Sequence, residues 1–107
     1  MQEISPQSAF EEISSGRAIG IDVRESQEWE AGHAENVTWN PMSAFDFDAL
    51  PTGKPLIFIC RSGNRSGQVV NKVASQFENV FNMTGGMKAW NEAGLTMVNT
   101  NGNPEVV

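Results

Sequence analysis

The sequence is poor in cysteine, histidine and long hydrophobic runs. Its 107 residues include one cysteine, Cys60, and one histidine, His33. One cysteine cannot form an internal disulfide, and the first residues, MQEISPQSAFEE, have neither the basic nor the apolar part of a secretion signal. We therefore expect a reducing, cytoplasmic setting. The longest apolar run, residues 56–60, is far shorter than the roughly 20 residues that cross a bilayer, so we expect a soluble protein without a membrane partner.

Basic residues are also scarce. Seven Lys and Arg stand against 13 Asp and Glu, and the formal net charge is −6. Negative charge disfavours nonspecific binding to nucleic acid and to anionic membranes. Carboxylate pairs, zinc-ligand spacings, a phosphate-loop lysine motif and a Ser/His/Asp set are not discernible. Any anion site must therefore be local.

The length predicts one domain over residues 1–107, burying roughly 65% of the surface that the unfolded chain exposes. The polar stretch of about residues 98–107 is expected to be a surface tail. The expected strands cover residues 18–23, 36–40, 55–60 and 79–83. The expected helices begin at Pro6 after the cap Ser5, at the cap Ser26, near Ser66, and after Gly85, with residues 42–50 left ambiguous.

Strands that alternate with helices predict an α/β fold with a mostly parallel sheet. Residues 55–60, PLIFIC, are apolar at consecutive positions, as is typical of a strand buried on both faces. We expect this strand to be central. The helix after it places Val69, Val70 and Val73 on one apolar face.

Cys60 ends this strand just before a helix, where α/β sheets bind ligands. Gly63 and Asn64 readily take unusual backbone conformations, which lets successive N–H groups form an anion nest. The helix from Ser66 adds its positive end, and Arg61 and Arg65 add two cations. These features predict a thiol pKa below the free value and a nucleophilic Cys60. The alternative is an inert buried cysteine, which does not need the arginines and glycine that follow.

The segment CRSGNRS (60–66) resembles the active-site loop of rhodanese-type sulfurtransferases. DVRESQEWEAGH (22–33) is similar to that family's Asp-x-Arg and Gly-His segment, and TGGMKAWNEAGL (84–95) resembles its closing Gly-Gly and tryptophan segment. Together they span nearly the whole chain. The resemblance implies a doubly wound parallel sheet with helices on both faces.

The resemblance also implies a mechanism, in which Cys60 takes a sulfane sulfur from thiosulfate or a related persulfide donor. The resulting persulfide passes to cyanide, another thiol or a protein acceptor. No metal or organic cofactor is implied. The binding residues implied are Arg61, Ser62, Gly63, Asn64, Arg65 and Ser66, whose backbone N–H groups hold the persulfide while the two arginines orient the donor.

The segment AENVTWNP (34–41) departs from the family pattern, which usually has isoleucine, a spacer and Gly-Ala there. We expect the departure to affect pocket shape and acceptor preference more than sulfur chemistry. Trp39 is a candidate to line the mouth of the site, because its strand should end at the same edge of the sheet.

Several other residues have structural interpretations. Asp22 and Arg24 are expected to form an ion pair or cap, with Glu28 as a further partner. His33 suits a hydrogen bond that fixes a turn rather than a Cys-His pair. Trp90 is expected in the core, and Asp46 and Asp48 on a solvated face.

Three other functions compete with an enzyme of this kind. A Cys-Arg phosphatase needs five residues between cysteine and arginine, whereas four separate Cys60 from Arg65. Arsenate reduction usually needs further thiols. A persulfide carrier or binding module serving a partner protein needs the same loop, and the sequence does not separate it from an enzyme.

Overall fold

A parallel sheet is the centre of the computed structural model, which describes residues 1–107. Its five strands lie in the order β1-β6-β5-β2-β4, and every neighbouring pair is parallel. These strands are β1 (Glu3–Ile4), β2 (Ile19–Asp22), β4 (Val37–Trp39), β5 (Leu56–Ile59) and β6 (Val80–Met83). β5 is the middle strand, as its unbroken apolar sequence predicts. Two short strands, β3 (His33–Ala34) and β7 (Met97–Val98), pair antiparallel in a separate sheet.

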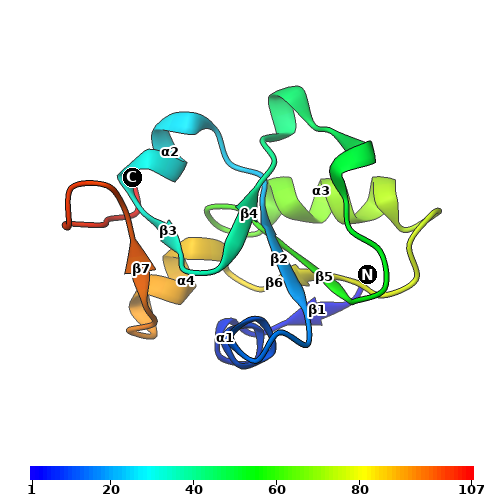
Figure 1. The fold of residues 1–107 in the computed structure, drawn as a ribbon, viewed down its shortest axis with the longest axis horizontal. Coiled ribbons are helices and arrows are strands. Elements are labelled where there is room, and N and C mark those ends of the chain that lie inside the picture. Colours follow the sequence, from blue (N-terminus) through cyan, green and yellow to red (C-terminus); the bar gives the residue numbers. More distant parts are fainter.

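Helices cover both faces of the sheet. The α-helices are α1 (Pro6–Ser14), α2 (Ser26–Ala31), α3 (Asn64–Val73) and α4 (Gly86–Glu92). Figure 1 shows α3 on one side of the sheet and α1 on the other. The predicted α/β fold with helices on both faces is confirmed. None of the helices combines the length and apolarity of a membrane span.

The side chains of β5 supply two cores. Leu56 and Phe58 pack with the valines of α3 in one cluster, and Cys60 belongs to that same cluster. Ile57 and Ile59 pack on the opposite face with residues of α1 and α4, including Trp90, which is 1% exposed as expected for a core residue. Side chains alternate along a strand, so the residue after Ile59 must face α3. The alternation therefore places Cys60 under the beginning of that helix.

Two helix starts agree with the prediction and two differ, and α4 begins at Gly86, directly after Gly85, as expected. Ser5 caps α1, and its hydroxyl accepts a hydrogen bond from the Ser8 N–H at 3.2 Å. The predicted cap Ser26 is wrong, because Ser26 is already helical and Glu25 is the N-cap of α2. The Glu25 N–H donates to Glu28 Oε1 at 3.2 Å. Glu28, three residues after the cap, thus provides an acceptor for a backbone N–H at the beginning of α2.

The helix expected near Ser66 begins two residues earlier, at Asn64. Gly63 precedes it with a φ of 105°, in the left-handed region that favours glycine. Asn64 itself is helical, so the unusual conformation expected of both residues is confined to Gly63. The ambiguous segment contains two short 3-10 helices, η1 (Met42–Ala44) and η2 (Phe47–Ala49).

Candidate functional site

Cys60 lies at the carboxyl end of the central strand, next to the beginning of α3. The residue is 1% exposed, and its thiol is free. Sγ accepts a hydrogen bond from the Gly63 N–H at 3.0 Å, and the Ser66 hydroxyl oxygen lies 3.3 Å from it. The loop thus turns back so that polar hydrogens point at the sulfur.

These hydrogen bonds control the acidity of the thiol. Burial by itself raises the pKa of Cys60, because it disfavours the charged thiolate. Hydrogen bonds from the Ser66 hydroxyl and from the backbone N–H groups of Ser66, Gly63 and Ser62 outweigh burial, and the pKa lies below its ordinary value. The lowered pKa agrees with the prediction from the sequence. At neutral pH, Cys60 is therefore a thiolate for a larger fraction of the time than an ordinary cysteine is, and the thiolate is the nucleophilic form.

The start of α4 anchors the other side of the loop. The Met87 N–H donates to the Cys60 carbonyl at 2.8 Å, and the Lys88 N–H donates to the Arg61 carbonyl at 2.9 Å. Gly86, with a φ of 59°, lets the backbones approach, since a Cβ there would collide with the carbonyl groups of Cys60 and Arg61. The sequence indicated a turn at Gly85 and Gly86, but it did not indicate this contact with Cys60.

Asn82 of β6 is a part of the site that sequence reasoning missed. It is 5% exposed. Its Nδ2 donates to the Gly63 carbonyl at 3.0 Å, and its Oδ1 accepts from the Ser66 hydroxyl at 2.5 Å. A polar residue inside the otherwise apolar strand VFNM was the available signal, since a buried amide needs partners.

Both arginines of the loop donate hydrogen bonds to other parts of the chain. Arg65 donates to Glu28 Oε1 and Oε2 at 2.7 Å each, a two-pronged ion pair between α3 and α2. The hydrogen bond from Arg65 holds the pKa of Glu28 below its ordinary value, and the same bond raises the pKa of Arg65. Arg61 is exposed, and its Nε donates to the Val107 carbonyl at 3.0 Å. Of the other loop residues, Ser62 and Asn64 are exposed, whereas Ser66 is buried.

Asp22 and Arg24 form the expected ion pair at the end of β2. Arg24 Nη2 lies 2.8 Å from Asp22 Oδ2, and both side chains are 0% exposed. Arg24 Nη2 also donates to the Gly32 carbonyl at 2.8 Å. Glu28 is not the further partner of this pair, because its carboxylate binds Arg65. The pair ties β2 to the end of α2, which is a structural role.

His33 and two tryptophans form an aromatic stack beside α2. His33 Nδ1 lies 2.8 Å from the Trp29 carbonyl oxygen, which is the turn-fixing hydrogen bond expected of His33. The His33 ring stacks on Trp29 with centroids 3.5 Å apart, and Trp39 lies 6.0 Å beyond. Trp39 is 38% exposed, and its Nε1 donates to the Arg24 carbonyl at 2.8 Å. This bond holds Trp39 beside Arg24, two residues after the end of β2.

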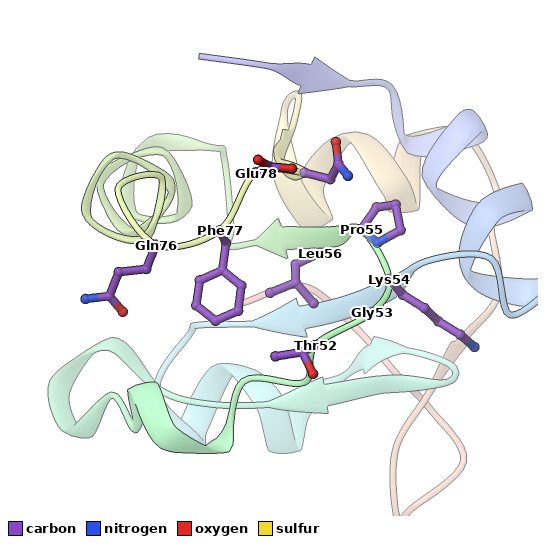
Figure 2. Close-up of a pocket in the computed structure, with 9 residues that line it drawn as sticks. Thr52, Gly53, Lys54, Pro55, Leu56, Gln76, Phe77 and Glu78 are labelled. Atoms are coloured by element: carbon purple, nitrogen blue, oxygen red, sulfur yellow. The ribbon is translucent and has the colours of Figure 1, made fainter.

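The pronounced hollow of the molecule lies at the other end of the sheet (Figure 2). Its volume is about 510 Å³, and it is lined by residues 52–56 and 76–79. The Leu56 and Phe77 side chains face one another there, whereas Lys54 points away. Leu56 begins β5 and Cys60 follows its end, so roughly 13 Å of strand separates them. The hollow is therefore not part of the Cys60 site. No cluster of three or more His, Cys, Asp or Glu side chains could hold a metal ion.

The fold and the site together define an α/β protein with a free thiol in a loop whose N–H group points at the sulfur, at the carboxyl edge of a parallel sheet. The chain matches the family model described as Rhodanese-like domain over residues 5–93. The protein belongs to the rhodanese-like family, and the resemblance seen in the sequence is confirmed.

The relatives include proteins of different named roles. The chain is 30% identical over 103 residues to thiosulfate sulfurtransferase GlpE of Actinobacillus succinogenes, covering 89% of this chain and 88% of that protein. It is 32% identical over 104 residues to an uncharacterised protein of Synechocystis, covering 94% of this chain and 58% of that protein. It is 32% identical over 92 residues to a putative sulfur carrier protein, YrkF, of Bacillus subtilis, covering 82% of this chain and 50% of that protein.

The fold also matches solved structures. A rhodanese-related protein of Thermoplasma volcanium superposes with a TM-score of 0.85 and 27% identity, covering 94% of this chain and 100% of that one. The chain thus spans the full length of one solved relative and only about half of YrkF or the Synechocystis protein.

Proposed function

We propose that this chain is a sulfurtransferase whose residues 1–107 act as one domain, with Cys60 as the sulfur-carrying nucleophile. The observation that carries the proposal is the environment of Sγ, which receives the Gly63 N–H at 3.0 Å and lies 3.3 Å from the Ser66 hydroxyl. Such donors stabilise a negatively charged sulfur. The similarity to GlpE over most of both chains supports the same activity.

In the first half-reaction, the Cys60 thiolate attacks the outer sulfur of thiosulfate. A new sulfur–sulfur bond forms to Sγ, the bond between the two donor sulfurs breaks, and its electron pair leaves with sulfite. Thiosulfate and thiolate together carry three negative charges, as do sulfite and the persulfide anion. In the second half-reaction, cyanide or a thiolate attacks the outer sulfur and the Cys60 thiolate leaves. This is double-displacement covalent catalysis.

The loop from Arg61 to Ser66 binds the reacting anions in this proposal. Its N–H groups hold the outer, negatively charged sulfur of the persulfide. Arg61 and Arg65 attract the sulfonate end of the donor. Glu28 already neutralises much of the Arg65 charge, so Arg61, which the donor reaches by displacing the Val107 carbonyl, supplies the freer cation.

Intact-protein mass spectrometry tests the proposal. We expect the reduced protein to gain the mass of one sulfur atom on incubation with thiosulfate and to lose it to cyanide as thiocyanate. Cys60→Ser, which keeps the size and polarity of the side chain, should gain no sulfur. A well-folded wild-type protein that takes up no sulfur from thiosulfate or from glutathione persulfide would refute the proposal.

A persulfide carrier that serves a partner protein is the second candidate. The similarity to the putative sulfur carrier YrkF favours it, and the engagement of both loop arginines favours a donor other than free thiosulfate. The two candidates differ in turnover. An enzyme releases many thiocyanate molecules per Cys60 from thiosulfate and cyanide, whereas a carrier loads once and then transfers its sulfur rapidly only to a protein thiol.

A further inference from the structure

Asn82 connects the sulfur of Cys60 to the far edge of the sheet. The Ser66 hydroxyl oxygen lies 3.3 Å from Sγ and 2.5 Å from Asn82 Oδ1. A serine hydroxyl has one proton, so it donates fully to the sulfur or to the amide, but not to both. Sγ and Asn82 Oδ1 therefore compete for the single hydrogen bond that the Ser66 hydroxyl can donate.

The Asn82 amide has one orientation that satisfies its neighbours. Nδ2 donates to the Gly63 carbonyl at 3.0 Å and to the Glu3 carboxylate at 3.2 Å. Both of these partners are acceptors, so they require the NH₂ group on their side. Oδ1 must then face Ser66 as an acceptor. Glu3, on the edge strand β1, thus helps to direct the proton of a hydroxyl beside Cys60.

We propose that Asn82 is a positioning residue whose Oδ1 accepts the hydrogen bond of the Ser66 hydroxyl whenever Sγ is uncharged and loses that bond to Sγ when Sγ is a thiolate. The role of this exchange in sulfur transfer rests on the proposed function of Cys60. In the persulfide the negative charge is on the outer sulfur, and Sγ is then a weak acceptor. Asn82 Oδ1 supplies the Ser66 hydroxyl with a partner in that state, so it favours the loaded form over the free thiolate.

Replacing Asn82 with leucine isolates this competition, because the other partners of Asn82 keep partners of their own. The Gly63 carbonyl still accepts from the Gly67 N–H at 3.1 Å. The Glu3 carboxylate is exposed and accepts from the Thr84 hydroxyl at 2.9 Å. The Ser66 hydroxyl alone loses its acceptor, and the sulfur is the acceptor that remains. The thiolate of Asn82→Leu is therefore stabilised relative to that of the wild type.

The charged groups around Cys60 stay the same in this variant. They come from the loop itself and from the elements packed against it: Arg61, Arg65, Glu28, Asp22, Arg24, Glu3 and Lys88. A change in thiol acidity between the wild type and Asn82→Leu therefore reports the redirected hydroxyl and not a change in local charge.

The test is the pH profile of Cys60 alkylation by iodoacetamide, an uncharged reagent. We expect the midpoint for Asn82→Leu to fall, so that alkylation at pH 6 is about threefold faster than in the wild type, which corresponds to about half a pKa unit. Ser66→Ala should raise the midpoint. In the double variant with Ser66→Ala, the Asn82→Leu change should have no effect, because there is no hydroxyl to redirect.

Asn79→Leu is the matched control, since it makes the same change at an exposed asparagine before the same strand. Its midpoint should equal that of the wild type. An unchanged or raised midpoint in folded Asn82→Leu overturns the proposal, and so does an equal fall in the absence of Ser66. If leucine prevents folding, Asn82→Ala carries the same expectation. Alkylation needs no sulfur donor, so a protein that shifts as expected but never gains sulfur refutes the proposed function and leaves this inference standing.

Discussion

The ion pair between Arg65 and Glu28 joins the end of the Cys60 loop to α2. Its two bonds are 2.7 Å each, and the side chains are 33% and 16% exposed. A two-pronged, half-buried pair is stronger than an exposed one. Meanwhile the groups that touch the sulfur are hydrogen-bond donors of Ser66, Gly63 and Ser62. At the scale of residues, Arg65 therefore fixes the position of the loop against α2.

This pair predicts a pH-dependent stability. The pKa of Glu28 is lowered by Arg65, so the pair stabilises the fold above the ordinary glutamate pKa, and the contribution is lost as the pH falls through the lowered value. We expect Glu28→Gln to reduce the free energy of unfolding by about 1 kcal/mol at pH 7 and the difference from wild type to shrink toward zero at low pH.

Urea unfolding at pH 7, 5 and 3 measures this difference. Glu30→Gln, on the same helix but exposed, is the matched control and should unfold like the wild type at each pH. A difference between Glu28→Gln and wild type that is as large at pH 3 as at pH 7 contradicts the assignment to this ion pair.

At the scale of elements, the first turn of α4 is the part that fits the loop most tightly. Its N–H groups bind the carbonyls of Cys60 and Arg61 at 2.8 and 2.9 Å. Unsatisfied N–H groups are a property of every helix start, and here they hold a neighbouring loop in place of a capping side chain. Because α3 and α4 lie on opposite faces of the sheet, the chain around Cys60 is held between the two helices.

Gly86→Ala should therefore destabilise the fold more than Gly94→Ala. Gly86 and Gly94 both have positive φ, 59° and 73°, but a Cβ at Gly94 meets nothing within 4 Å, whereas one at Gly86 meets the backbone of Cys60 and Arg61. Gly94→Ala should cost about 1 kcal/mol of backbone strain. Gly86→Ala should cost about 2 kcal/mol more, because the loop must also move. Equal costs in urea unfolding would contradict the close approach.

At the scale of the whole molecule, the tail after β7 packs against α2. The Glu105 N–H donates to the Ala31 carbonyl at 2.9 Å, and the Asn99 side chain donates to the same carbonyl at 3.0 Å. Val106 packs on the core face that contains Trp90. Figure 1 shows the end of the chain beside α2. The tail thus brings its Val107 carbonyl to Arg61, which connects its position to the Cys60 loop.

Gly32→Ala should detach this tail. Gly32 has an extended φ of 167° that any residue adopts, but a Cβ there would lie 2.6 Å from the backbone nitrogen of Glu105. We expect amide hydrogen exchange at Glu105 to become at least about tenfold faster, as its bond to Ala31 is lost. Exchange at Lys88, which binds the Arg61 carbonyl, should not change. Equal protection of Glu105 in the variant and the wild type would show that the tail does not rest on Gly32.

The sequence by itself determined the layers of the fold and the place of the thiol after its central strand. The consecutive apolar residues of β5 require burial on both faces, and the alternation of strands and helices then requires a parallel sheet. The single thiol at the end of that strand, followed by Gly63, already predicted a thiol in a loop whose N–H groups point at the sulfur. These features are local in the chain, so local patterns suffice to predict them.

The tertiary structure alone decided which distant residues complete the site. Asn82, Gly86 and Glu28 are 22, 26 and 32 positions from Cys60 in the chain, and only the packing of β6, α4 and α2 brings them to the loop. The sequence likewise predicted Arg61 and Arg65 as two cations beside the thiol, and it did not indicate that packing pairs Arg65 with Glu28 of α2. Hydrogen bonds between distant residues depend on distances of a few tenths of an ångström, and no periodicity or spacing in the chain encodes them.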